Sequence, residues 1–136
     1  MTIALQYCNI TVNDLDESIA FYGDALGLEV RNDVASGGFR WVTLGSATQP
    51  VLEIVLSEPH AGRSQADGDA LQELLTKGVL PMTVFRTDDV DATFEKVRAS
   101  GAEVLQEPID QSWGPRDCAF RDPSGNMVRI SQGPSA

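Results

Sequence analysis

Two charged side chains that interrupt apolar, strand-like runs are the first candidates for chemistry. Glu53 lies in the run VLEIVL, with valines on either side of it on its own face of the expected strand, and Arg129 lies in MVRIS, on the same face as Met127. A carboxylate among apolar neighbours can serve as a general base, and a guanidinium can donate several hydrogen bonds to an anion or a carbonyl group. The sequence therefore offers one candidate base and one candidate ligand-binding cation.

Other reactive side chains lack the partners that catalysis needs. The cysteines, Cys8 and Cys118, form no CxxC pair, and no histidine lies near Cys118 in the sequence to activate its thiol. His60 is the single histidine and lies in the loop SEPHAGRS, where we expect it to be solvated. The segment ASGG at 35–38 predicts a hairpin turn and no phosphate-binding loop. We therefore expect neither nucleophilic catalysis nor nucleotide binding by these residues.

Aromatic residues lie near the candidate strands. Phe39 and Trp41 share one face of the run GFRWVTLG and either line a pocket or fill the core side of a sheet. Trp113 precedes Gly-Pro and is expected in a loop at the rim. Arg116 and Asp117 are adjacent in the next strand, so they point to opposite faces, and one of them can face inward. Aromatic walls with a few polar groups suit a flat organic ligand.

Composition excludes several classes of function. The 136 residues, 42% of them hydrophobic, are enough for one domain with a sizeable core. A net charge of −10 disfavours nucleic-acid binding because phosphate backbones are repelled. The N-terminus lacks the pattern of a signal peptide, and no apolar run reaches the roughly 18 residues of a membrane span. We expect a cytoplasmic protein whose two cysteines are reduced and buried.

Two segments of the chain, 9–30 and 82–105, follow the same plan of a strand, an acidic helix start, an amphipathic helix and a second strand. Asp14 opens a capping-box pattern at the first helix, and Gly27 and Gly101 stand where helices end. Two further strand-like runs follow in each half. The pattern predicts an α+β fold of two β-α-β-β-β units, neither of which could bury its sheet alone.

The predicted organisation is one domain made of two modules. The first module spans 1–57 and the second spans 80–133, and the linker 58–79 contains a short helix in DALQELLTKG that ends at Gly78.

The motifs DLDESIAFYGDALGLEV and DDVDATFEKVRASGAEV…FRDPSGNMVRI, placed in two such modules, resemble the vicinal oxygen chelate superfamily. That superfamily includes glyoxalase I, extradiol dioxygenases, fosfomycin-resistance enzymes and bleomycin-resistance proteins. The resemblance covers almost the whole chain and implies tandem βαβββ modules that form a cupped mixed sheet, in a homodimer. It specifies the fold more than the function, because this fold hosts several chemistries as well as binding proteins.

The resemblance also implies where a metal would be held, since in metal-dependent members each module supplies one ligand from its first strand and one from its last. The matching positions here are Tyr7, Glu53, Met82 and Arg129. Only Glu53 is a good ligand, because Arg129 has no free lone pair and repels cations. Adding Asn9 and His60 through a shifted alignment would still give an unusual set. We therefore expect no metal and no cofactor.

In place of the metal, Arg129 is expected to face into the cup and to pair with Glu53. This pair is either structural only, or it also presents donors to an anionic or carbonyl-bearing ligand. The expected ligand-binding residues are Tyr7, Phe39, Trp41, Glu53, Met82, Trp113, Arg116 and Arg129.

Three functions fit the sequence. The first is a metal-independent protein that binds a small molecule, for example an antibiotic or metabolite that it sequesters, as in the bleomycin-resistance branch. The second is a lyase, isomerase or dioxygenase, either with a metal or with Glu53 as the base. The third is a regulatory or interaction domain whose pocket is vestigial.

Overall fold

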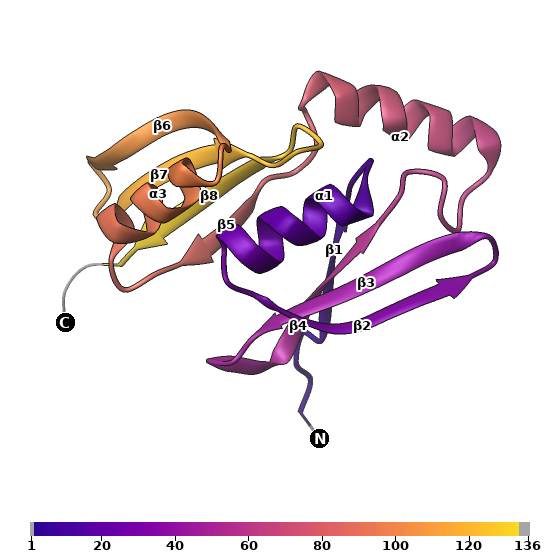
Figure 1. Cartoon of the computed structure of the whole chain (residues 1–136), viewed down its shortest axis with the longest axis horizontal. Coiled ribbons are helices and arrows are strands. Elements are labelled where there is room, and N and C mark those ends of the chain that lie inside the picture. The colour runs from indigo at the N-terminus through magenta and orange to yellow at the C-terminus, as the bar shows by residue number, and fades with distance from the viewer. Residues whose placement is uncertain (1, 134–136) are drawn as a thin grey trace.

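The computed structural model describes residues 2–133 and contains two similar modules side by side (Figure 1). The elements of the first module are β1 (Tyr7–Thr11), α1 (Leu15–Ile19), the π-helix η1 (Ala20–Ala25), β2 (Glu29–Ser36), β3 (Phe39–Ser46) and β4 (Gln49–Ser57). Those of the second are β5 (Thr83–Arg86), α3 (Val90–Ala99), β6 (Glu103–Asp110), β7 (Arg116–Arg121) and β8 (Met127–Gln132), and α2 (Gln65–Lys77) connects the modules. The predicted α+β class and the two βαβββ modules are confirmed.

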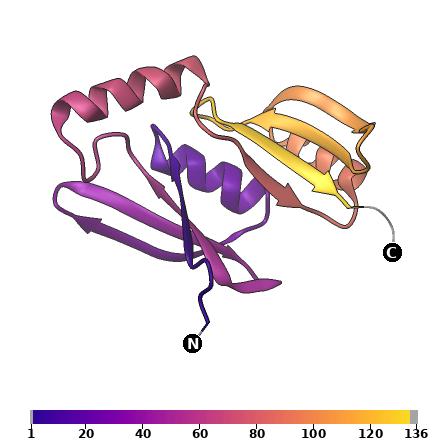
Figure 2. The same cartoon turned by 180° about the vertical axis from the view of Figure 1, so that it is seen from behind.

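Each module forms its own four-stranded mixed sheet. The strand orders are β1-β4-β3-β2 and β5-β8-β7-β6, and in each sheet the first strand pairs in parallel with the last while the other pairs are antiparallel. Figure 1 shows α3 in front of its sheet, and in Figure 2, from behind, the strands lie in front of this helix. We call the sheet faces turned away from α1 and α3 the open faces; Glu53 lies on the first and Arg129 on the second.

The helices begin and end where the sequence predicts. Asp14 accepts a hydrogen bond from the backbone N–H of Glu17 at 3.0 Å, and Asp89 caps α3 in the same way. Gly101 follows α3 with a φ of 93°, a conformation that residues with a Cβ rarely adopt. In contrast, α2 starts several residues earlier than predicted, because Ser64 caps it by accepting from the backbone N–H of Asp67. No helix among the described residues has the length and apolar character of a membrane span.

The core lies between the helices and the sheet faces that they cover. Its largest fully buried apolar side chains are Tyr22, Phe120, Leu44, Leu56, Leu75, Ile130, Val12, Val42, Val90, Val97 and Val128. Both modules contribute to one cluster, and the ring of Tyr22 lies 6.2 Å from that of Phe85 across the junction. Cys118 is buried as predicted, whereas Cys8 is exposed in the chain, so the prediction of a buried thiol is wrong for Cys8. It lies on β1, whose outer edge has no partner strand within the described residues.

A buried carboxylate organises the turn that precedes β8. Oδ1 of Asp122 accepts hydrogen bonds from the backbone N–H groups of Ser124 and Asn126, each at 2.9 Å. Its other oxygen accepts from the side-chain amide of Asn126 at 2.9 Å and from the hydroxyl of Tyr22 at 2.7 Å. Tyr22 belongs to η1 of the first module, so this carboxylate joins the two halves of the chain.

Two further hydrogen bonds cross the same junction. The side-chain amide of Asn126 donates to the carbonyl oxygen of Thr11 at 2.8 Å, and the hydroxyl of Ser124 accepts from the backbone N–H of Asn13 at 2.8 Å. Thr11 is the last residue of β1, and Asn13 lies in the segment that connects β1 with α1. The turn DPSGN therefore fixes the second module against the start of the first helix.

We expect Asn126→Ala to lower the free energy of unfolding by about 2–3 kcal/mol, because it removes the side-chain donor to the carbonyl oxygen of Thr11 and one of the donors to the buried Asp122 carboxylate. Urea denaturation monitored by circular dichroism measures this loss. The control is Asn32→Ala on the exposed strand β2, which should change stability by less than about 0.5 kcal/mol. A loss of that small size for Asn126→Ala would contradict the role of the junction.

We also expect the junction to weaken at alkaline pH. Burial and the neighbouring Asp122 carboxylate raise the pKa of Tyr22 above its usual value of about 10. The unfolded chain loses this proton first, so the stabilisation is fully present below pH ~10 and is lost as the pH rises further, by up to ~1.4 kcal/mol per pH unit. Burial also raises the pKa of Cys118 to about 11, which adds a loss that starts at lower pH.

The measurement compares variants that all retain Cys118, so the ionisation of its thiol lowers the stability of each by the same amount. Urea unfolding at a series of alkaline pH values should show a shallower decline in Tyr22→Phe than in the wild type. Tyr7→Phe serves as the control, because it removes the same hydroxyl group from an exposed residue outside the junction. Equal slopes in all three proteins would show that Tyr22 ionises as easily in the folded chain as in the unfolded one.

Candidate functional site

Arg129 lies at the centre of the second open face. Strand β8 alternates as predicted, with Val128 and Ile130 buried against the core and Arg129 half-buried on the other face. Nη1 of Arg129 donates to Oδ2 of Asp117 at 3.0 Å and to Oε1 of Gln106 at 3.1 Å. Within the described residues, its Nε and Nη2 groups donate no hydrogen bond. These donors remain available to a molecule on the open face.

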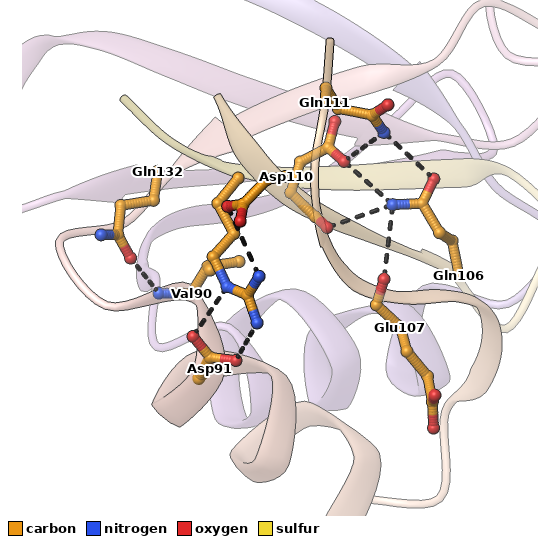
Figure 3. Close-up of polar contacts among 9 residues, drawn as sticks. Val90, Asp91, Gln106, Glu107, Asp110, Gln111 and Gln132 are labelled. Atoms are coloured by element: carbon orange, nitrogen blue, oxygen red, sulfur yellow. Dashed lines mark hydrogen bonds and ion pairs between the residues drawn. The ribbon is translucent and has the colours of Figure 1, made fainter. Parts of the chain in front are cut away.

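Asp117 is the anchor of this arginine and is only 2% exposed. Burial by itself would raise the pKa of Asp117, but hydrogen bonds from Gln111, Gln106 and Arg129 outweigh it and hold the pKa below its usual value. The amides of Gln106 and Gln111 donate to Oδ1 of Asp117 at 2.9 and 2.7 Å, and Figure 3 shows the two glutamines converging. The carboxylate is therefore ionised, and it holds Arg129 in one position.

On the first open face, Glu53 pairs with an arginine that the sequence analysis did not single out. Nη1 of Arg31 lies 3.2 Å from Oε2 of Glu53, and Nη2 donates to the carbonyl oxygen of Ser46 at 3.0 Å. Arg31 lies at a register irregularity of β2, which turns its side chain toward this face. Gly45, in register with Glu53, makes room for the guanidinium, because a Cβ there would overlap it.

The predicted pair between Glu53 and Arg129 is therefore wrong within one chain. Each has a partner on its own sheet, Arg31 at 3.2 Å for the glutamate and Asp117 at 3.0 Å for the arginine. The physical reason is that each desolvated charge is compensated within its own sheet, Arg129 from the adjacent strand β7 and Glu53 from β2, whose Arg31 reaches across β3 at Gly45.

The two remaining positions from the metal-site alignment, Tyr7 and Met82, lie where the first strand of each module begins. Tyr7 is in register with Glu53 on the first open face and is 49% exposed. In the second module, the residue in register with Arg129 is Val84. Met82, two residues earlier, is exposed and precedes β5. Tyr7 is therefore the cross-strand neighbour of Glu53. Met82 is not the cross-strand neighbour of Arg129, because Val84 occupies that position.

The aromatic candidates lie on or beside the open faces. Trp41 is in register with Ser57 of β4 on the first face and lies under Gly62, whose Cβ would be 3.7 Å from the ring. Phe39, two residues earlier, borders a cavity of about 310 Å³ near the start of α2. Trp113 is 71% exposed in the loop between β6 and β7. Gln111 fixes the base of that loop by donating its backbone N–H to Pro115 at 2.8 Å.

Arg116 lies on the opposite side of β7 from these residues. Its guanidinium donates to both oxygens of Asp91 on α3, at 3.0 and 2.9 Å, and contacts Asp110 at 3.5 Å (Figure 3). Of the adjacent residues Arg116 and Asp117, the aspartate is the one on the open face. The expectation that Arg116 lies with the ligand-binding residues is not met by this geometry.

The single histidine lies outside the open faces. Nε2 of His60 is 2.8 Å from Oδ1 of Asp69, which also accepts from the amide of Gln65 at 2.9 Å. Gly68 makes this possible, because a Cβ there would overlap the imidazole ring. His60 thus connects the loop before α2 to its first turns, remains partly exposed to solvent as expected, and lies outside the strand ladder that contains Glu53.

The side chains at the matching positions do not fit a divalent metal ion. Glu53 is their only carboxylate, and it already contacts the guanidinium of Arg31. Arg129 is itself a cation. In the part of the chain that the structure describes, no group of three or more histidine, cysteine or acidic side chains could hold a metal ion. We therefore derive no chemistry through a metal.

A cavity also lies on the helix side of the molecule. It measures about 1040 Å³ and runs between η1, the end of α3 and the turn at Asp122. Its lining mixes small residues with charges of both signs, including Asp24, Lys96 and Glu103. Its lining residues include neither Arg129 nor Glu53. We therefore place the candidate site on the open faces.

Sequence analysis missed Arg31, Gln106 and Gln111. Register irregularities of β2 and β6 lie at Arg31 and on both sides of Gln106, and such irregularities break the alternation used to assign faces. Gln111 lies in a loop, where no periodicity applies. The sequence signal for this network was the adjacent pair Arg116 and Asp117. Neighbouring residues of a strand point to opposite faces, so one of the two had to lie on the open face.

Comparison with known proteins agrees with this architecture. A family model described as the Glyoxalase/Bleomycin resistance protein/Dioxygenase superfamily matches residues 4–130. The crystal structure of UcmS2 superposes with a TM-score of 0.85 at 33% identity, covering 96% of this chain and 98% of that one. TnmS3, an antibiotic-binding protein from Streptomyces sp. CB03234, gives a TM-score of 0.76 at 25% identity, covering 98% of each chain.

Relatives with other names are also similar over nearly the full length. A probable lactoylglutathione lyase from Synechocystis sp. is 27% identical over 132 residues, which are 94% of this chain and 94% of the relative. The match of the family model over almost all of the sequence decides the assignment, and this chain belongs to the glyoxalase/bleomycin resistance protein/dioxygenase superfamily.

Proposed function

We propose that this protein binds a small, flat organic molecule on its open faces without a metal, and that it sequesters an antibiotic or a metabolite. The observation that carries the proposal is Arg129, held by a buried carboxylate while two of its donor groups lack partners within the described residues. A fixed cation with donors to spare orients a ligand that carries an acceptor. The likeness to TnmS3, described as antibiotic-binding, supports the same class of function.

The proposed binding residues come from both open faces. Glu53 and Tyr7 form the polar part of the first, Trp41 and Phe39 provide aromatic surface beside them, and Arg129 is the donor of the second. Met82 and Trp113 stand at the rim, and Arg116 is left out because it faces α3.

We further propose that two copies of the chain share the site. The open faces leave large apolar side chains exposed, among them Tyr7, Val51, Met82 and Val84. Such surface favours a partner, and a second copy would bring the first open face of one chain toward the second open face of the other. We also propose that the modules 1–57 and 80–133 form one domain and that the protein is cytoplasmic.

A screen of planar polycyclic antibiotics and metabolites tests binding. Both tryptophans of the chain are among the proposed binding residues, so we expect a ligand to quench their fluorescence. In Trp113→Ala, Trp41 still reports binding, and we expect the dissociation constant to rise about tenfold, the equivalent of about 1.4 kcal/mol of stacking. The matched control is Leu74→Ala on α2, also exposed, which should bind like the wild type. Absence of binding across the screen would contradict the proposal.

A metal-dependent lyase is the second candidate, because several full-length relatives are named probable lactoylglutathione lyases. Elemental analysis of protein purified without chelators separates the two candidates. We expect less than about a tenth of a divalent ion per chain and no turnover of lactoylglutathione, because one carboxylate and an arginine make a poor ligand set. One tightly held ion per chain together with turnover would replace the binding proposal with the enzyme.

A further inference from the structure

A second arginine, Arg86, shares the open face with Arg129. In the parallel ladder between β5 and β8, Val84 is in register with Arg129, and Arg86 is in register with Ser131. Phe85, between them, packs toward the core, so Val84 and Arg86 point the other way. Arg86 is exposed and its guanidinium lies beside Gly133, where a Cβ would be 3.5 Å from Nη2.

Arg86 lacks a compensating charge within the described residues, since no acidic side chain there lies within ion-pair distance of it. Arg129 is compensated by Asp117 at 3.0 Å. These three charges make this part of the face net positive, although the chain as a whole carries −10. An anion is repelled by most of the surface and is attracted here.

The donors on this patch are close enough to act together. Arg129 and Ser131 are two residues apart on one strand, which places their Cα atoms roughly 6.5 Å from each other, and Arg86 is the cross-strand neighbour of Ser131 at roughly 5 Å. The Ser131 hydroxyl donates no hydrogen bond to another described residue. Two guanidinium groups with a hydroxyl between them match the oxygens of a carboxylate.

We propose that the ligand carries a carboxylate and that Arg86, Ser131 and Arg129 bind it, with Arg86 as the residue that selects acids over neutral molecules. This inference rests on the proposed binding function and names the chemical class of its ligand. The aromatic part of the ligand then extends from this patch toward the rim.

The experiment uses a panel of bicyclic and tricyclic aromatic carboxylic acids, each paired with its primary amide, such as 2-naphthoate with 2-naphthamide. Tryptophan fluorescence gives the dissociation constants for the wild type, Arg86→Gln, Arg86→Lys and the control Arg98→Gln on α3. We expect acids to bind about tenfold more tightly than their amides, and Arg86→Gln to remove about that factor for the acids alone. Arg86→Lys should recover part of it, since the charge remains while the forked donor is lost.

The outcomes separate this inference from the proposed function. If acids and amides bind equally well and Arg86→Gln changes neither, the carboxylate site is wrong and the binding function stands. If no member of the panel binds at millimolar concentration, the carboxylate site is wrong, and the screen of planar antibiotics and metabolites decides the binding function separately. If Arg98→Gln weakens acids as much as Arg86→Gln, the preference comes from overall charge, and a specific site is excluded.

Discussion

The buried carboxylate of Asp122 is the interaction on which the relation between the two modules depends. It accepts hydrogen bonds from two backbone N–H groups of its own turn, from Asn126 and from Tyr22 of the other module. The two modules share one apolar cluster, and this polar junction adds directed hydrogen bonds that fix one module, with its open face, against the other. The candidate site therefore depends on a contact on the side of the molecule away from the ligand.

The same arrangement of charge occurs twice on the open faces. Glu53 with Arg31 and Arg129 with Asp117 are each a half-buried pair formed within one sheet. Such pairs cost desolvation and are tolerated when further hydrogen bonds satisfy the remaining groups, which Ser46 does for Arg31 and Gln106 does for Arg129. These neighbours explain how charged side chains remain on the half-buried open faces with their charges compensated.

Much of the fold could be predicted from the sequence because its signals are local. The cap at Asp14, the glycine after α3 and the alternation around Arg129 each depend on a few neighbouring residues. The partners of Glu53 and Arg129 could not be predicted, because they come from strands whose register shifts at irregularities near Arg31 and Gln106. Likewise, the burial of Asp122 and its bond to Tyr22 link residues 100 positions apart, beyond the reach of any periodic pattern.

The duplicated backbone is nearly symmetric, whereas the chemistry on it is not. Where the first module offers a glutamate beside a tyrosine, the second offers an arginine beside a valine. A molecule that spans both faces thus meets a hydrogen-bond acceptor at one end and donors at the other. In the proposed site, turning the ligand end for end would bring its acceptors to Glu53 and its donors to Arg129, so the repeated backbone would carry a site with a single direction.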